Sequence, residues 1–86
     1  MSIQPINSNN NNTYFKVGDT IKCISEKSDH YNILFVITGF VVEDNKDCAM
    51  IAYLSKGKKE ELLDSLSCDY DVTIPILNMY FIKVVG

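Results

Sequence analysis

The alternation of apolar and polar residues predicts a protein built mainly from β-strands. In the stretch FKVGDTIKCI, Val17, Ile21 and Cys23 alternate with polar residues, which is the two-residue period of a strand with one buried face. Gly18 and Asp19 are turn-forming residues at the start of this stretch. We therefore expect the chain to turn into a first strand whose three apolar residues face the core.

The next part of the chain predicts a long bent strand and a hairpin. Residues 26–32 are polar and predict a loop, and residues 33–43 (ILFVITGFVVE) are almost continuously apolar. Gly39 stands where a strand of this length would bend or bulge. Residues 44–47 (DNKD) predict the hairpin turn, because Asp and Asn tolerate left-handed backbone conformations. Residues 48–54 (CAMIAYL) then return as the partner strand.

The strand pattern is interrupted after residue 54. Leu62, Leu63 and Leu66 have the spacing of an amphipathic helix, so residues 58–67 predict a short helical insertion. Strand alternation returns at residues 70–74 and should end before Pro75.

The C-terminal run predicts the closing strand. We expect a turn near Asn78, followed by a strand over residues 79–85. Five short strands in 86 residues describe one small domain, and closure into a barrel would hide the sheet edges. The Asn-rich residues 1–12 offer no apolar face and predict a disordered tail before a domain spanning residues 13–86.

The order of these segments carries a family resemblance. The stretch VGDTIKCI, a polar loop, NILFVITGF, an acidic turn, CAMIAYL and a terminal MYFIKVV resemble SH3-like small β-barrels, of the kind found in short phage accessory proteins. The resemblance implies a mainly β fold, a five-stranded SH3-like barrel with a short helical insertion. That insertion departs from the plain family pattern and leaves an α+β meander as the alternative.

Charge and composition argue against one class of function, the sequence-specific recognition of DNA. The net charge is −3, and all eight basic residues are Lys, so the planar guanidinium that reads guanine or phosphate in bidentate fashion is absent. The chain also lacks the strong basic field of a typical nucleic-acid-binding protein. Sequence-specific recognition of duplex DNA is therefore not expected.

The sequence contains no recognised catalytic motif. Phosphate-loop, dinucleotide-binding and zinc-hydrolase patterns are all missing, and the adjacent residues Asp29 and His30 are not expected to point at each other as an acid/base pair would. Cys23, Cys48 and Cys68 are widely spaced and odd in number, so we expect small buried hydrophobic residues in place of a zinc site or a disulfide. We expect a protein that is not an enzyme and holds no cofactor or metal.

The candidate binding residues lie in two polar segments. SH3-like barrels use aromatic residues on loops beside their first and second hairpins to bind peptides, methylated side chains or nucleic acid. This resemblance singles out Tyr31, with its neighbour His30, in the first loop. Lys56, Lys58 and Lys59 form the second segment and would attract phosphates without sequence preference.

Three functions fit these observations. The leading hypothesis is a phage-type accessory protein that modulates or inhibits a host protein, such as a defence toxin or nuclease. The alternatives are weak, non-specific binding of RNA or single-stranded nucleic acid through the lysine segment, and self-assembly into a homo-oligomer through an edge strand.

Hydropathy predicts the location of the protein. No run approaches the roughly 18 consecutive apolar residues of a membrane helix, and the polar N-terminal residues lack a signal-peptide pattern. We expect no membrane partner and a place in the cytoplasm, which is the host cytoplasm if the gene belongs to a phage.

Overall fold

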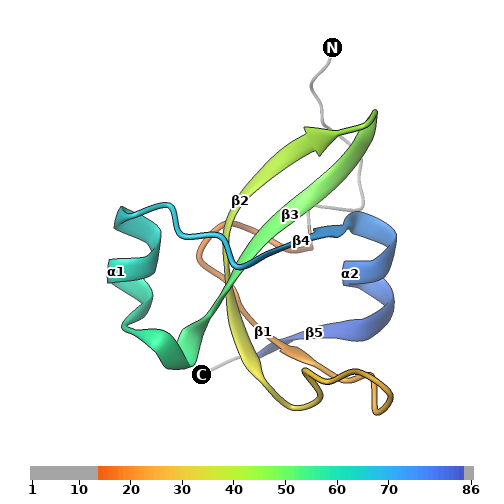
Figure 1. Ribbon diagram of the computed structural model, residues 1–86, viewed down its shortest axis with the longest axis horizontal. Helices are drawn as coiled ribbons and strands as arrows, with labels where there is room; N and C mark the ends of the chain where they lie inside the picture. The colour runs from red at the N-terminus through yellow and green to blue at the C-terminus, as the bar shows by residue number, and fades with distance from the viewer. Residues whose placement is uncertain (1–13, 85–86) are drawn as a thin grey trace.

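The computed structural model describes residues 14–84, so the predicted tail at residues 1–12 lies outside the described residues. Five strands form the framework and three short helical segments connect them (Figure 1). The strands are β1 (Thr20–Cys23), β2 (Leu34–Glu43), β3 (Lys46–Tyr53), β4 (Tyr70–Thr73) and β5 (Phe81–Val84). The helical segments are the 3-10 turn η2 (Leu54–Lys56), α1 (Lys59–Asp64) and α2 (Ile74–Tyr80).

The five strands make one antiparallel sheet in the order β4-β3-β2-β1-β5. The first four strands follow one another as a meander, and β5 returns to pair with β1. The predicted five-stranded, mainly β fold is therefore confirmed. Closure into a barrel is not shown, because no pairing joins the edge strands β4 and β5 within residues 14–84.

The two faces of the sheet carry one helix each. Phe35 and Val36 are neighbours on β2, and because side chains alternate along a strand they point to opposite faces. Phe35 belongs to the main core, which Leu77 of α2 covers. Val36 belongs to a smaller cluster that Leu62 of α1 covers. Figure 1 accordingly shows α1 and α2 on opposite sides of the strands.

The main core contains two of the three residues expected there from the first strand. Ile21 and Cys23 are buried in it together with Phe35 and Phe81, and Phe40 is partly buried against it.

Two expectations about buried residues are wrong. Val17 is 54% exposed, because β1 begins only at Thr20 and the turn before it, with Gly18 at φ +95°, points Val17 outward; Phe15 occupies the core instead. Cys68 is exposed because it lies in the segment before β4, whereas Cys48 is buried; both are free thiols.

The bend and the hairpin lie where the sequence predicts them. The pairing of β2 with β3 shifts register between Ile37 and Gly39, which is the expected irregularity. Asp44 and Asn45 have φ of 51° and 65°, so they form a two-residue turn with both residues left-handed. Strand β3 therefore begins at Lys46, earlier than expected.

A buried hydroxyl connects this bend to a distant segment. Thr38 lies beside Gly39 and is 3% exposed. Its Oγ1 atom lies 2.6 Å from the carbonyl oxygen of Ser67, to which it donates, and 3.3 Å from that of Met50. The hydroxyl thus fixes the chain just before β4 to the bent part of β2.

The helical insertion is shorter than predicted. α1 spans Lys59–Asp64 and buries Leu62, but Leu66 lies beyond the helix, with φ of 52° and an exposed side chain. A residue other than glycine in the left-handed region ends a helix, which explains why the expected span to residue 67 is not reached.

The predicted strand over residues 79–85 is wrong over its first part. The chain forms α2 over Ile74–Tyr80, and β5 begins only at Phe81. Pro75 occupies the first turn of this helix, where a missing N–H costs nothing and the fixed φ is favourable. Ile74 and Leu77, three residues apart, are the buried face. No helix within residues 14–84 is long and apolar enough to cross a membrane.

The helical assignment of α2 predicts a sharp contrast between two of its residues. Leu77 is fully buried, whereas Met79 is 59% exposed. We expect Leu77→Ala to lower the free energy of unfolding by about 2–5 kcal/mol, because it leaves a cavity in the core. The control Met79→Ala should change it by less than about 0.5 kcal/mol. Urea denaturation measures both values, and equal effects would contradict this packing.

Candidate functional site

A pocket of about 430 Å³ opens beside the sheet. Its floor is apolar and consists of core residues, among them Phe35, Ile51 and Phe81. One wall comes from β4 and another from α2 through Ile76 and Tyr80. The size and the mainly apolar lining are typical of ligand-binding pockets.

The loop between β1 and β2 forms the polar side of the pocket. Ser25, Lys27, Ser28 and His30 line it. The Ser28 hydroxyl accepts a hydrogen bond from the His30 backbone N–H at 3.0 Å, which shapes the loop locally. At the end of the loop Asn32 has φ of 67° and its N–H donates to the Cys23 carbonyl at 2.9 Å. These bonds hold the His30 side chain over the pocket.

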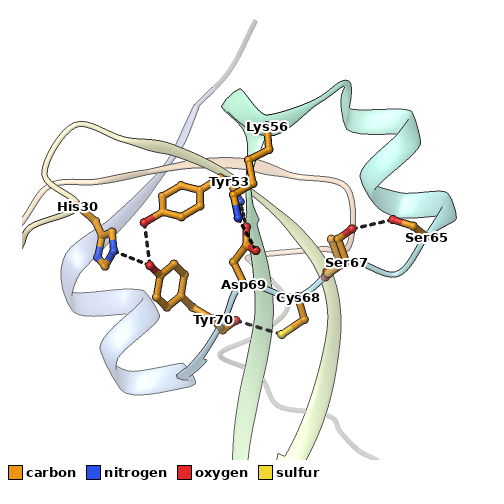
Figure 2. Close-up of polar contacts among 9 residues, drawn as sticks. His30, Tyr53, Lys56, Ser65, Ser67, Cys68, Asp69 and Tyr70 are labelled. Atoms are coloured by element: carbon orange, nitrogen blue, oxygen red, sulfur yellow. Dashed lines mark hydrogen bonds and ion pairs between the residues drawn. The ribbon is translucent and has the colours of Figure 1, made fainter.

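His30, Phe35, Tyr53 and Tyr70 form an aromatic cluster beside the pocket. His30 Nε2 lies 3.0 Å from the Tyr70 hydroxyl oxygen, and that oxygen lies 2.8 Å from the Tyr53 hydroxyl oxygen (Figure 2). The His30 and Tyr70 rings meet edge to face, with centroids 4.7 Å apart. Hydrogen bonds and ring contacts together fix these side chains in one arrangement.

Asp69 anchors the other end of this cluster. One carboxylate oxygen accepts the Tyr53 backbone N–H at 2.8 Å and the other lies 2.9 Å from Lys56 Nζ (Figure 2). These two bonds hold the pKa of Asp69 below its usual value. Lys56 Nζ also lies 5.1 Å from the centre of the Tyr53 ring. Lys56 is therefore already engaged by an anion and an aromatic ring.

Tyr53 and Cys68 keep their protons at neutral pH. The hydrogen bond with Tyr70, aided by desolvation, raises the pKa of Tyr53 to about 12. Desolvation and a hydrogen bond to Asp71 raise the pKa of Cys68 to about 11. A thiol must lose its proton to act as a nucleophile, so Cys68 is unreactive at neutral pH.

The part of the chain from residue 14 to residue 84 offers no cluster of three metal-ligating side chains. Cys68 lies 3.1 Å from Asp71 but has no third partner of that kind. The groups around the pocket can therefore donate and accept hydrogen bonds and make aromatic contacts.

The structure brings together only some of the binding residues that the sequence suggests. His30 lines the pocket, and Lys56 reaches the aromatic cluster through Tyr53. Tyr31 is exposed but does not line the pocket. Lys58 and Lys59 lie at the start of α1, outside the pocket lining.

Sequence reasoning missed several residues of the site, among them Tyr53, Asp69, Tyr70, Asp71 and Tyr80. Tyr70 and Asp71 read as ordinary alternating positions of a strand, and Tyr80 was hidden because α2 was not predicted. The tyrosines offered a general signal, because a tyrosine packed against a core usually finds a partner for its hydroxyl, but the sequence does not indicate which side chains meet.

Comparison of the chain with protein-family models, with curated proteins and with solved structures finds no match. Function is therefore inferred from the pocket and the aromatic cluster, together with the sequence resemblance described above.

Removing the central hydroxyl of the cluster should change the titration of its neighbour. We expect Tyr70→Phe to lower the pKa of Tyr53 from about 12 toward the usual value of 10, because the bond that stabilises the protonated phenol is lost. Ultraviolet absorbance of tyrosinate measures this shift. Tyr31→Phe is the control, because it also removes one phenol from the titration. If the Tyr70→Phe curve differs from wild type only by the absence of one phenol, and the pKa of Tyr53 does not shift, the hydrogen bond is contradicted.

Asp69 should make the protein sensitive to acid. Its pKa is lowered in the folded state, so its stabilising effect is present above the usual value of 3.8 and is lost as the pH falls through the folded pKa. We expect Asp69→Asn, which can still accept the Tyr53 N–H, to weaken the fall in melting temperature below about pH 4. Asp64→Asn, on the exposed side of α1, is the control. Identical pH profiles for wild type and Asp69→Asn would rule out this role.

Proposed function

We propose that the chain is a non-enzymatic binding protein that modulates or inhibits a protein partner through this pocket. The observation that carries the proposal is the 430 Å³ pocket with an apolar floor and a few hydrogen-bonding groups at its rim. Such a combination provides burial energy from the floor and orientation from the polar groups.

Exposed apolar side chains beside the pocket support a protein partner. Ile76, Met79 and Tyr80 are all exposed and recur at the i, i+3, i+4 spacing of one helix face on α2. Ile76 and Tyr80 also line the pocket, so the helix face and the pocket form one surface. Tyr and Met are enriched in the contact surfaces between proteins.

The protonation states at the site support binding in place of catalysis. Tyr53 and Cys68 both have raised pKa values and stay neutral at pH 7. The imidazole of His30 is hydrogen-bonded to Tyr70, and that tyrosine is bonded in turn to Tyr53. This chain of hydrogen-bonded side chains holds the pocket in shape.

The proposed target class follows from the sequence resemblance. We propose an SH3-like small barrel of phage accessory type, acting on a host protein such as a defence toxin or nuclease. The five antiparallel strands support that likeness, although β4 and β5 are not paired. The position of the pocket beside the loop after β1 also agrees with it, because such barrels bind ligands at their loops.

The nucleic-acid alternative receives less support. Lys56 is paired with Asp69 at 2.9 Å, and Lys58 and Lys59 stand beside Glu60 and Glu61 in the first turn of α1. These lysines lie beside acidic residues in a protein of net charge −3, so they provide little of the positive field that attracts phosphates.

Affinity capture with matched tyrosine variants tests the proposal. Tyr80 lines the pocket and Tyr31 does not, yet they are 41% and 43% exposed. We expect the wild-type protein to capture a specific protein from nuclease-treated lysate of a candidate host. Tyr80→Ala should weaken that binding by at least about 2 kcal/mol, as for a hot-spot tyrosine, whereas Tyr31→Ala should not.

The opposite pattern would overturn the proposal. Capture that depends on nucleic acid would vanish after nuclease treatment, and it would weaken with salt and with the Lys56→Glu, Lys58→Glu and Lys59→Glu changes combined. Binding that survives nuclease but ignores Tyr80→Ala would place the contact elsewhere on the protein.

A further inference from the structure

The pocket runs along an open edge of the sheet. β4 pairs with β3 on one side and is the last strand of the sheet on the other. Tyr70, Asp71 and Val72 are consecutive residues of β4, and all three line the pocket. Successive side chains of a strand point to opposite faces, so a pocket lined by all three residues reaches the backbone of this edge strand as well as one of its faces.

An open edge can pair with another extended chain. Its outward N–H and C=O groups lack strand partners and offer a template for one more strand. Among the described residues, Cys68 is the one whose side chain bonds to the β4 backbone, with its Sγ 3.5 Å from the Tyr70 carbonyl oxygen. A thiol is a weak donor, so an incoming amide would replace it readily.

The charges around this edge are mainly negative. Asp71 lines the pocket and accepts only the Cys68 thiol, whereas the two ion pairs within residues 14–84 are Lys56–Asp69 and Lys83–Asp19. Glu26 and Asp29 are exposed on the loop beside the pocket, where Lys27 is the one lysine in the lining.

The titration of Cys68 supports this description of the surface. Desolvation is the main cause of its raised pKa, the hydrogen bond to Asp71 is the next, and the charges of Asp71, Asp69 and Glu43 add smaller contributions in the same direction. These carboxylates disfavour a negative charge near the end of β4 and favour a positive one.

We infer that the free edge of β4 accepts an extended segment of the partner protein in which apolar and basic residues alternate. The segment adds a strand to the sheet, places an apolar side chain over Phe35 in the pocket, and sets a basic side chain beside Asp71. Main-chain hydrogen bonds provide affinity in this type of recognition, and alternate side chains provide specificity. The inference rests on the proposed function and specifies the chemistry of the partner.

Selection from a library of short random peptides tests the inference. The library is selected separately on wild-type protein, on Asp71→Lys and on Glu60→Lys, which changes an exposed residue of α1 on the opposite face of the sheet. We expect wild type and Glu60→Lys to enrich peptides with alternating apolar and basic residues. Asp71→Lys should bind these peptides about tenfold more weakly or worse, and added salt should weaken binding to wild type.

Two further measurements locate the bound peptide. Amide hydrogen exchange should slow in residues 70–73 when an enriched peptide binds. N-methylation of alternate peptide amides should weaken binding by about tenfold or more in one of the two registers, because it removes the donors that face β4. If Asp71→Lys proves unstable, Asp71→Asn replaces it, because this change keeps the size of the side chain. It should also weaken peptide binding, but by less than Asp71→Lys.

Several results would overturn the inference. These are no enrichment, enrichment of acidic peptides, equal binding by wild type and Asp71→Lys, or protection confined to β5. The two proposals fail in different ways. A partner captured through Tyr80 without any effect of Asp71 would remove only this inference, whereas basic peptides that bind β4 without a captured protein partner would remove only the proposed inhibition.

Discussion

The packing of Phe35 connects the hydrophobic core to the candidate site. Its side chain is 1% exposed and its ring lies 5.0 Å from that of Tyr53 and 5.8 Å from that of Phe81, measured between centroids. The same ring meets His30 and forms part of the pocket floor. A small domain has few residues to bury, so one aromatic residue serves both stability and the shape of the binding surface.

The second constraint is that the sheet stays open. Each face is covered by a short helix, but β4 and β5 remain as edges. Proteins usually protect edges by keeping them short or by placing charges on them, and here both edge strands have four residues and β4 carries Asp71. A charge at an edge disfavours indiscriminate pairing, and on electrostatic grounds it disfavours a chain with an opposing like charge most strongly.

The sequence predicted the parts of the fold that depend on local rules. Alternation predicted β1 and β4, and a nearly continuous apolar run followed by a turn predicted β2 and β3. Gly39 marked the irregularity in β2, and Asp44 and Asn45 provided the left-handed turn. The helix α2 was missed because a short apolar run fits either a strand or a helix. Its proline, expected only to end a strand, begins the helix.

The site was less predictable because it depends on contacts between distant segments. His30 and Tyr70 lie 40 positions apart in the sequence, and nothing near either residue indicates that they form a hydrogen bond. His30 was chosen for its place in a loop, and Lys56 for its charge. Their shared connection through Tyr53 and Tyr70 could only come from the tertiary structure.

The hydrogen bonds of Thr38 connect the bend in β2 to the position of β4. The Thr38 hydroxyl donates to the Ser67 carbonyl and so attaches the segment before β4 to the bent part of β2. The orientation of β4, which forms one wall of the pocket, therefore depends on the bend in β2. Substitutions around Gly39 would then change the shape of the pocket, although neither Thr38 nor Gly39 lines it. The pocket can therefore change shape through the angle between two strands, without any change in the residues that line it.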